Sequence, residues 1–252
     1  MKNNETQISA STLLTVNDLC KSFGDLVVLD HFNLTLQKNQ NIVVLGKSGS
    51  GKSVLIKCII GLLKPDSGHI TVFEKEITSL NSDELDKIRK SIGFLFQSNA
   101  LYDSMTVREN LEFPLRRHSQ KRNESEVEKM VVQALEDVGL KHTIDMMPEE
   151  LSGGMRKRIA LARTLILKPS IILYDEPTTG LDPITAREII ELMNTIKRKY
   201  GTSALVISHD MNCIRNAGDL IALLWDGKCH VLDTYEHLLK SEDPVVRNFF
   251  AN

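Results

Sequence analysis

The sequence is short of cysteine, carries no large excess of charge of either sign, and contains no long apolar run. Its cysteines number four in 252 residues and form no CxxC pair. Neither His69 nor His230 stands at a zinc-like spacing from them, so we expect neither a disulfide scaffold nor a zinc site. Reduced core thiols are expected at all four positions, Cys20, Cys58, Cys213 and Cys229.

Charge and hydropathy exclude two further classes. Lys and Arg number 31 against 33 Asp and Glu, for a net charge of -2. The chain therefore lacks the strong positive electrostatic field that binds nucleic acid. No apolar run approaches the roughly 18 to 20 residues that span a bilayer. Residues 1–11 are polar and lack the basic and apolar regions of a secretion signal. We therefore expect a cytosolic chain of one α/β domain that does not itself cross a membrane.

The pattern of apolar residues predicts a β-rich start, an inserted helical lobe, and a return to buried strands. Several short strands are expected first, followed by strand, loop, helix and strand, which is the order of a βαβ unit. The lobe covers about residues 98–150, where Asn123 and Glu126 predict a capping box. Strands are expected at 13–19, 26–29, 32–36, 42–45, 69–73, 171–174 and 204–208, helices at 54–63, 152–167 and 183–200 between Asp182 and Gly201, and a hairpin over 220–232 that turns at Asp226 and Gly227.

A phosphate-binding loop is predicted at GKSGSGKS, residues 46–53. The segment fits GxxxxGK[ST] and lies between a buried strand and a helix, as that motif requires. Gly46 and Gly51 allow backbone amides to approach phosphate oxygens, and the helix start adds its positive dipole end. Lys52 is expected to neutralise the outer phosphates and Ser53 to offer its hydroxyl to Mg²⁺. The alternative is a plain glycine-rich turn.

Two carboxylates follow the buried strand at 171–174. Asp175 and Glu176 emerge at its carboxyl end, which is where open α/β sheets bind ligands. We expect Asp175 to hold Mg²⁺ through water and Glu176 to orient or deprotonate the water that attacks the terminal phosphate. Two acids facing solvent are the alternative, and the upstream phosphate loop makes the catalytic role the better interpretation.

The segment LSGGM, residues 151–155, with RKRIALAR after it, resembles the signature segment of ATP-binding-cassette (ABC) ATPases. Met155 departs from the usual Gln. The resemblance covers residues 13–240 and implies a P-loop ATPase fold of the ABC type, with a mixed sheet core, an N-terminal antiparallel β region and an inserted α-helical subdomain. It divides the chain into a single ATPase domain with a RecA-like core at 13–97 and 168–240, a helical subdomain at about 98–167, and a short tail at 241–252.

The same resemblance implies a dimer of two copies packed head to tail, with two ATP molecules between them. The signature residues Ser152, Gly153 and Gly154 of one copy would close over the nucleotide of the other. Without the resemblance, Phe23 would be a core residue, Gln97 a strand end, and His209 a packed or capping residue. The resemblance implies that Phe23 stacks on adenine, Gln97 reaches Mg²⁺ and water, and His209 contacts the terminal phosphate. It also implies that Asp182 faces the partner copy. The remaining residues that it adds to the phosphate loop are Lys47, Ser48, Gly49, Ser50 and Val54.

Residues 95–115, LFQSNALYDSMTVRENLEFPL, are similar to the ATPases of MCE-associated, Mla-type phospholipid transporters. That similarity implies membrane permease subunits and MCE-domain chains as partners, with the ATPase on the cytoplasmic side of the membrane. Six apolar residues of the lobe are candidates for lining a groove that binds the permease. We expect more than half of these six to pack in the core of the lobe and not in the groove. The candidates are Leu101, Tyr102, Met105, Val107, Leu111 and Phe113. The chain ends two residues after Phe250, so we expect no long extension that clasps a partner.

Two alternatives stay open. Another cargo, such as an amino acid or a drug, is possible because an ATPase subunit does not touch the cargo. A soluble ABC protein acting on ribosomes or DNA would use the same chemistry, and the basic pairs Arg116–Arg117 and Lys121–Arg122 raise that possibility. We expect no nucleic-acid partner, because the chain has neither a second cassette nor a long coiled-coil insertion.

Overall fold

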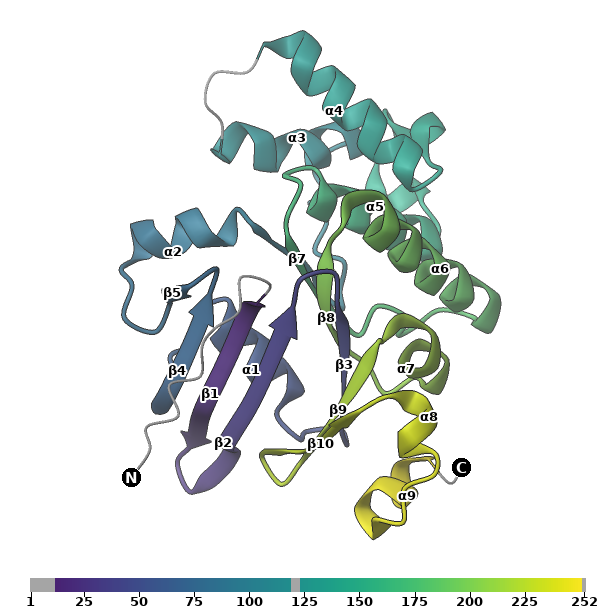
Figure 1. Cartoon of the computed structure of the whole chain (residues 1–252). Coiled ribbons are helices and arrows are strands. Elements are labelled where there is room, and N and C mark those ends of the chain that lie inside the picture. Colours follow the sequence, from purple (N-terminus) through teal and green to yellow (C-terminus); the bar gives the residue numbers. More distant parts are fainter. Residues whose placement is uncertain (1–11, 119–122, 251–252) are drawn as a thin grey trace.

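The computed structural model describes residues 12–118 and 123–250, and these form two sheets with helices packed around them (Figure 1). Residues 1–11, Lys121 and Arg122 lie outside the described part. The first sheet is antiparallel, in the order β2-β1-β4-β5. Its strands are β1 (Thr12–Phe23), β2 (Leu26–Gln37), β4 (Ser67–Val72) and β5 (Lys75–Glu76).

The second sheet has the order β10-β9-β3-β8-β7-β6. Neighbours from β9 to β6 run parallel, and only β10 is antiparallel to its neighbour. Its central strands are short and apolar because both faces are covered. The strands are β3 (Asn41–Leu45), β6 (Ile92–Leu95), β7 (Ile171–Asp175), β8 (Ser203–Ile207), β9 (Leu220–Trp225) and β10 (Lys228–Asp233).

The helices separate into those that cover the sheets and those that form the upper part of Figure 1. A core between the two sheets encloses α1, and a second core lies under α6 and α7. A third core joins α3, α4 and α5. The helices are α1 (Lys52–Ile59), α2 (Ser82–Arg89), α3 (Val107–His118), α4 (Glu124–Asp137), α5 (Gly153–Leu165), α6 (Pro183–Tyr200), α7 (Met211–Ala217), α8 (Tyr235–Leu238) and α9 (Pro244–Phe250), with 3₁₀ turns at Lys141–Thr143 and Pro148–Glu150.

Much of the predicted pattern is present. The mixed sheet and the antiparallel N-terminal region confirm the predicted fold class. Helix α6 begins after Asp182, which caps it, and ends at Gly201 in the left-handed region. The hairpin of β9 and β10 turns at Asp226 and Gly227, as expected. In the described residues no helix is both long and apolar enough to span a bilayer.

Four local expectations were wrong. The strands expected at 26–29 and 32–36 are one strand, β2, because an extra residue is absorbed at His31, whose φ is 52°. Helix α1 ends at Ile59, before Gly61 with φ of 67°, rather than running to residue 63.

Helix α2 was not expected, although Asn81 and Glu84 form a complete capping box at its start. For α4, the structure shows Asn123 accepting from the amide of Glu126, which is the first half of a capping box. The fourth error concerns the cysteines: Cys58 and Cys213 are buried, but Cys20 and Cys229 are only partly so. In the lobe, Val107 and Leu111 belong to the core, so they cannot line a groove.

The first sheet yields a stability prediction at Gly68, which lies opposite an irregularity in β1. A Cβ atom at this residue would stand 2.3 Å from the carbonyl oxygen of Asp18, and φ is +88°. Gly68→Ala therefore adds a backbone collision to left-handed strain and should cost about 3 kcal/mol of unfolding free energy. The matched control is Gly24→Ala, where φ is +59° but no atom lies within 4 Å, and about 1 kcal/mol is expected. Equal losses in urea unfolding would contradict the close approach.

Candidate nucleotide-binding site

Three strands end at one edge of the second sheet and bring distant segments together. Val44 of β3 and Asp175 of β7 both pair with Ile207 of β8 in parallel register. The loops that follow these strands therefore surround one cavity of about 780 Å³. Of the predicted site residues, its walls include Phe23, Gly46, Lys47, Ser48, Gly49, Gly51, Lys52, Ser53, Val54, Gln97, Glu176 and His209.

The phosphate loop has a shape that only glycine permits at two positions. Gly51 has φ of 101°, and a Cβ there would lie 2.7 Å from Cγ1 of Val28. At Gly46 a Cβ would lie 2.6 Å from Oγ of Ser50. Gly51 is also the residue before α1, so the free amides of the first helical turn face the cavity. The loop is thus built to present N–H groups to an anion.

Lys52 is held inside the loop. Its Nζ donates to the carbonyl oxygens of Gly46 at 2.8 Å and Lys47 at 2.9 Å, and the residue is only 8% exposed. Burial lowers the pKa of this ammonium, while Glu176 and Asp175 act in the opposite direction. A buried cation at the centre of an amide-lined loop is suited to a multiply charged phosphate group.

Asp175 is placed to bind a cation. Its Oδ1 atom is buried and accepts no hydrogen bond from the described residues. Burial, followed by the negative charge of Glu176, raises the pKa of Asp175, and a hydrogen bond with Ser53 opposes that shift. A carboxylate oxygen without a partner beside a hydroxyl oxygen fits the oxygen ligands that Mg²⁺ prefers. This donor pair, Ser53 and Asp175, therefore agrees with the expected metal site.

Glu176 and His209 form a second polar pair across the cavity. His209 Nδ1 lies 2.9 Å from Oε1 of Glu176, and the hydroxyl of Thr179 donates to Oε2 at 3.3 Å. Glu176 has a left-handed backbone with φ of 49°, and its amide donates to the carbonyl of Ile207. Its carboxylate is therefore fixed by both neighbours and backbone, which is the arrangement that a base acting on a bound water needs.

The remaining predicted residues lie away from this cavity. Ser152 caps α5 by accepting from the amide of Met155 at 3.2 Å, and Gly153 is the first residue of that helix. Gly154 packs closely against α6, since a Cβ there would lie 2.6 Å from Cγ2 of Thr185. Asp182 accepts from the amides of Ile184 and Thr185. Neither the signature segment nor Asp182 contributes to the walls of the cavity.

The sequence reasoning missed several residues in or beside the site, of which Lys157 and Phe249 are the most informative. Lys157 of α5 is 2% exposed, and its Nζ donates to the backbone carbonyl of Gln97 at 3.0 Å. The available signal was its position on the same helical face as Ala160 and Leu161, where a charged residue is unusual. The second is Phe249 of α9, which lines the cavity and packs edge-on against Trp225. No local pattern marks Phe249, because its role depends on how the end of the chain folds back.

The phosphate loop yields a prediction at Lys52. Lys52→Ala removes the buried positive charge, so ATP affinity should fall sharply and turnover should drop on the order of 100-fold or more. The matched control is Lys87→Ala, an exposed lysine of α2 that does not line the cavity, and this variant should bind and hydrolyse ATP normally. Titration with ATP and steady-state hydrolysis would measure both variants. Near-normal hydrolysis by Lys52→Ala would remove this lysine from the mechanism.

Comparison with known proteins agrees with this geometry. The family model described as ABC transporter matches residues 29–179. The chain is 41% identical over 236 residues to the probable ribonucleotide transport ATP-binding protein mkl of Mycobacterium tuberculosis, covering 94% of this chain and 66% of that protein, just under two thirds of its length.

It is also 38% identical over 237 residues to the intermembrane phospholipid transport system ATP-binding protein MlaF of Haemophilus influenzae, covering 94% of this chain and 89% of that protein. The methionine import ATP-binding protein MetN of Rhizobium johnstonii is 37% identical over 225 residues, which cover 89% of this chain and 62% of that protein.

A solved structure has the same fold. The dimeric post-hydrolysis state of the ATP-binding cassette MJ0796, bound to ADP and Pi, is 32% identical, with a TM-score of 0.80 over 88% of this chain and 98% of that one. The family match over more than half of the chain and the convergence of the phosphate loop with Asp175 and Glu176 lead to one conclusion. This chain belongs to the ABC transporter family and has the fold of an ATP-binding cassette.

Proposed function

We propose that two copies of this chain form a head-to-tail dimer that hydrolyses ATP with Mg²⁺ on the cytoplasmic side of a membrane, and that they power a permease that moves phospholipid. The observation that supports the dimer is that, within one chain, the signature segment does not reach the cavity formed by the phosphate loop. The phosphate loop, Glu176 and His209 share one cavity, while Ser152, Gly153 and Gly154 lie elsewhere with exposed or half-exposed backbone at a helix start.

In this proposal the cavity holds ATP through three kinds of contact. Residues 46–54 surround the phosphates, with Lys52 as the counter-charge. Phe23 is 49% exposed and lines the same cavity, so its ring is available for stacking on adenine. Ser53, Asp175 and Gln97 would hold Mg²⁺, which would offset negative charge on the phosphate oxygens.

In this proposal, Glu176 and His209 carry out hydrolysis. Glu176 would orient the attacking water and accept its proton, because its carboxylate is fixed by Thr179 and His209. His209 has a largely exposed side chain and would contact the terminal phosphate from the other side. Gln97 enters the cavity from the end of β6, and its backbone is anchored by Lys157.

The second copy would complete each site. Ser152 already caps α5, so the amides of Gly153 and Gly154 are presented at the positive end of that helix. A terminal phosphate held between this helix start and the partner's phosphate loop would attract both surfaces. Asp182, exposed at the start of α6, would face the same interface. Loss of that phosphate would release the dimer.

Glu176→Gln tests the catalytic assignment and the dimer together. The amide keeps the size of the side chain but cannot accept a proton, so ATP binding should persist while turnover falls on the order of 100-fold or more. The proposal also expects this variant to dimerise on adding ATP, as measured by light scattering. Glu191→Gln, an exposed carboxylate on α6, is the matched control and should hydrolyse normally. A variant that binds ATP and stays monomeric would exclude the shared-nucleotide dimer.

Phospholipid is the cargo that the similarities support best. Residues 95–115 resemble Mla-type ATPases, and the similarity to MlaF extends over 89% of that protein. Tyr102 of the lobe and Phe96 just before it remain exposed, and Tyr102 packs against Phe113, which leaves apolar surface for a permease. The names of mkl and MetN point to ribonucleotide and methionine, so another cargo is the competing proposal.

Purifying the native complex separates these cargoes. A tagged copy of this chain, extracted from its own membranes in mild detergent, should bring down a permease, MCE-domain chains and bound phospholipid, identified by mass spectrometry. The control is the same extraction from cells that carry the untagged chain. Recovery of a receptor for amino acids, with no MCE-domain chain, would contradict the phospholipid proposal while leaving the ATPase unaffected.

A further inference from the structure

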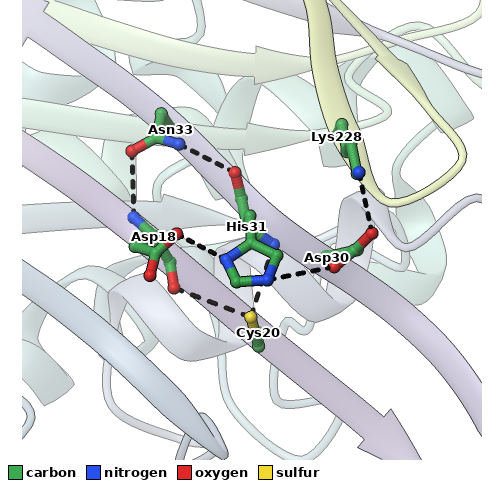
Figure 2. A network of polar contacts seen from close by, with 6 residues as sticks. All are labelled: Asp18, Cys20, Asp30, His31, Asn33 and Lys228. Carbon is green, nitrogen blue, oxygen red and sulfur yellow. Dashed lines mark hydrogen bonds and ion pairs between the residues drawn. The ribbon is translucent and has the colours of Figure 1, made fainter.

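A compact group of polar side chains lies on the exposed face of the first sheet, and the ATPase chemistry does not use it (Figure 2). Cys20, Asp30 and His31 each offer one ligand atom, and the three atoms lie within 4.8 Å of one another. Among residues 12–118 and 123–250 this is the one such group of three. Its members come from neighbouring strands, β1 and β2, so the group does not depend on a loop.

Two irregularities in the strand pairing create the group. Between the pairs Val16↔Leu34 and Leu19↔Phe32, β1 has one residue more than β2. Before the pair Lys21↔Leu29 the extra residue is on β2. The residues in these bulges that have left-handed backbones are Asp18, with φ of 53°, and His31, with φ of 52°. Such conformations are unfavourable for side chains other than glycine, and bulges often re-aim side chains.

The orientation of the His31 ring is fixed. Its Nδ1 lies 2.6 Å from Oδ1 of Asp18, and because a carboxylate only accepts, this nitrogen carries the proton. Asn33 accepts from the amide of Asp18 and donates to the carbonyl of His31, so it joins the two bulges. A carboxylate that binds one ring nitrogen is the usual support of a metal-binding histidine, whose other nitrogen then faces the metal.

The second ring nitrogen faces two groups that offer electrons. His31 Nε2 lies 3.6 Å from Oδ1 of Asp30, which is too long for a good hydrogen bond. Lys228 Nζ lies 3.0 Å from the other carboxylate oxygen of Asp30, and the backbone amide of Asp30 donates to the carbonyl oxygen of Gly227. Cys20 Sγ completes the group and accepts from the amide of His31 at 3.3 Å. A nitrogen lone pair, a carboxylate oxygen and a sulfur atom therefore lie within 4.8 Å of one another, with Lys228 on the other oxygen of Asp30.

We propose that Cys20 Sγ, His31 Nε2 and Asp30 Oδ1 form a binding site for a divalent transition-metal ion of the zinc class. Sulfur, imidazole and carboxylate together are a ligand set that suits Zn²⁺ and not Mg²⁺. Ligands of a tetrahedral zinc ion stand roughly 3.5 Å apart, given bonds of about 2.0–2.3 Å. The three atoms lie within 4.8 Å of one another, so binding would draw them together by about 1 Å at most. Binding releases the thiol proton of Cys20 to solvent.

The position of the site indicates what the ion would do. It would join β1 to β2 across both bulges, and Asp30 also contacts the turn of the β9–β10 hairpin through Gly227 and Lys228. A bound ion would therefore stabilise the folded chain, and the stabilisation would grow with the logarithm of the ratio of ion concentration to dissociation constant. The inference is independent of the transported cargo and of the dimer.

Cobalt binding to the full chain tests the proposal, because Co²⁺ replaces Zn²⁺ in such sites and gives a visible spectrum. With nucleotide absent and thiols reduced, the chain should bind one Co²⁺ with tetrahedral bands and a thiolate-to-cobalt charge-transfer band, and Zn²⁺ should displace it. Cys20→Ser should abolish the thiolate band, and His31→Asn should weaken binding by about 100-fold or more. Asn tolerates the left-handed backbone, so the fold is expected to persist in that variant.

Two matched controls address the other thiols and histidines. Cys229→Ser changes the second half-buried cysteine, and His69→Asn changes an exposed histidine of the same sheet; both should bind Co²⁺ as the unaltered chain does. Zn²⁺ should raise the unfolding temperature of the unaltered chain and of both controls, but not that of Cys20→Ser. A spectrum without a thiolate band, or a thiolate band that survives Cys20→Ser, would overturn the proposal. Failure here would leave the ATPase assignment intact.

Discussion

The parallel pairing of β3, β8 and β7 is the constraint on which the site depends. Because these strands run the same way and are in register, the phosphate loop, the Asp175–Glu176 pair and His209 emerge at one edge. The charged side chains at this edge then determine which ligands it can bind. Lys52 is a buried cation beside Asp175 and Glu176, and burial raises the pKa of Asp175. In the proposed complex, phosphate beside Lys52 and a metal ion beside Asp175 would change this charge balance, so ligand binding and the shape of the edge would depend on each other.

Sequence reasoning succeeded where the physics is local. The phosphate loop, the carboxylates after a buried strand and the caps at Asp182 and Gly201 each depend on a few neighbouring residues, and all appear at the expected positions. The fold class followed from the order of these elements and from the resemblance that their motifs support. Which of these residues act in catalysis stays a prediction, because geometry alone does not measure rates.

What sequence reasoning missed depends on contacts between distant segments. Helix α2 has a complete capping box but a weak apolar face, so its signal was polar rather than periodic. The group of Cys20, Asp30 and His31 was overlooked because two bulges, which no local pattern marks, are needed to bring these side chains together. Lys157 belongs to the signature helix, yet it binds the carbonyl of Gln97, 60 residues earlier. That contact joins the start of the lobe to the helix after the signature, so the two segments are expected to move as one.

Helix α9 links the last part of the structure to the nucleotide-binding cavity. Phe249 lies on α9, the last helix described, and it is both a wall of the cavity and a neighbour of Trp225, whose ring carries Lys47 on its face. A substitution that shifts α9 would therefore disturb the phosphate loop through the edge-on pair of Phe249 and Trp225 and the Lys47 side chain. A change in nucleotide affinity caused by a substitution in α9 should therefore be interpreted as a change to the binding pocket.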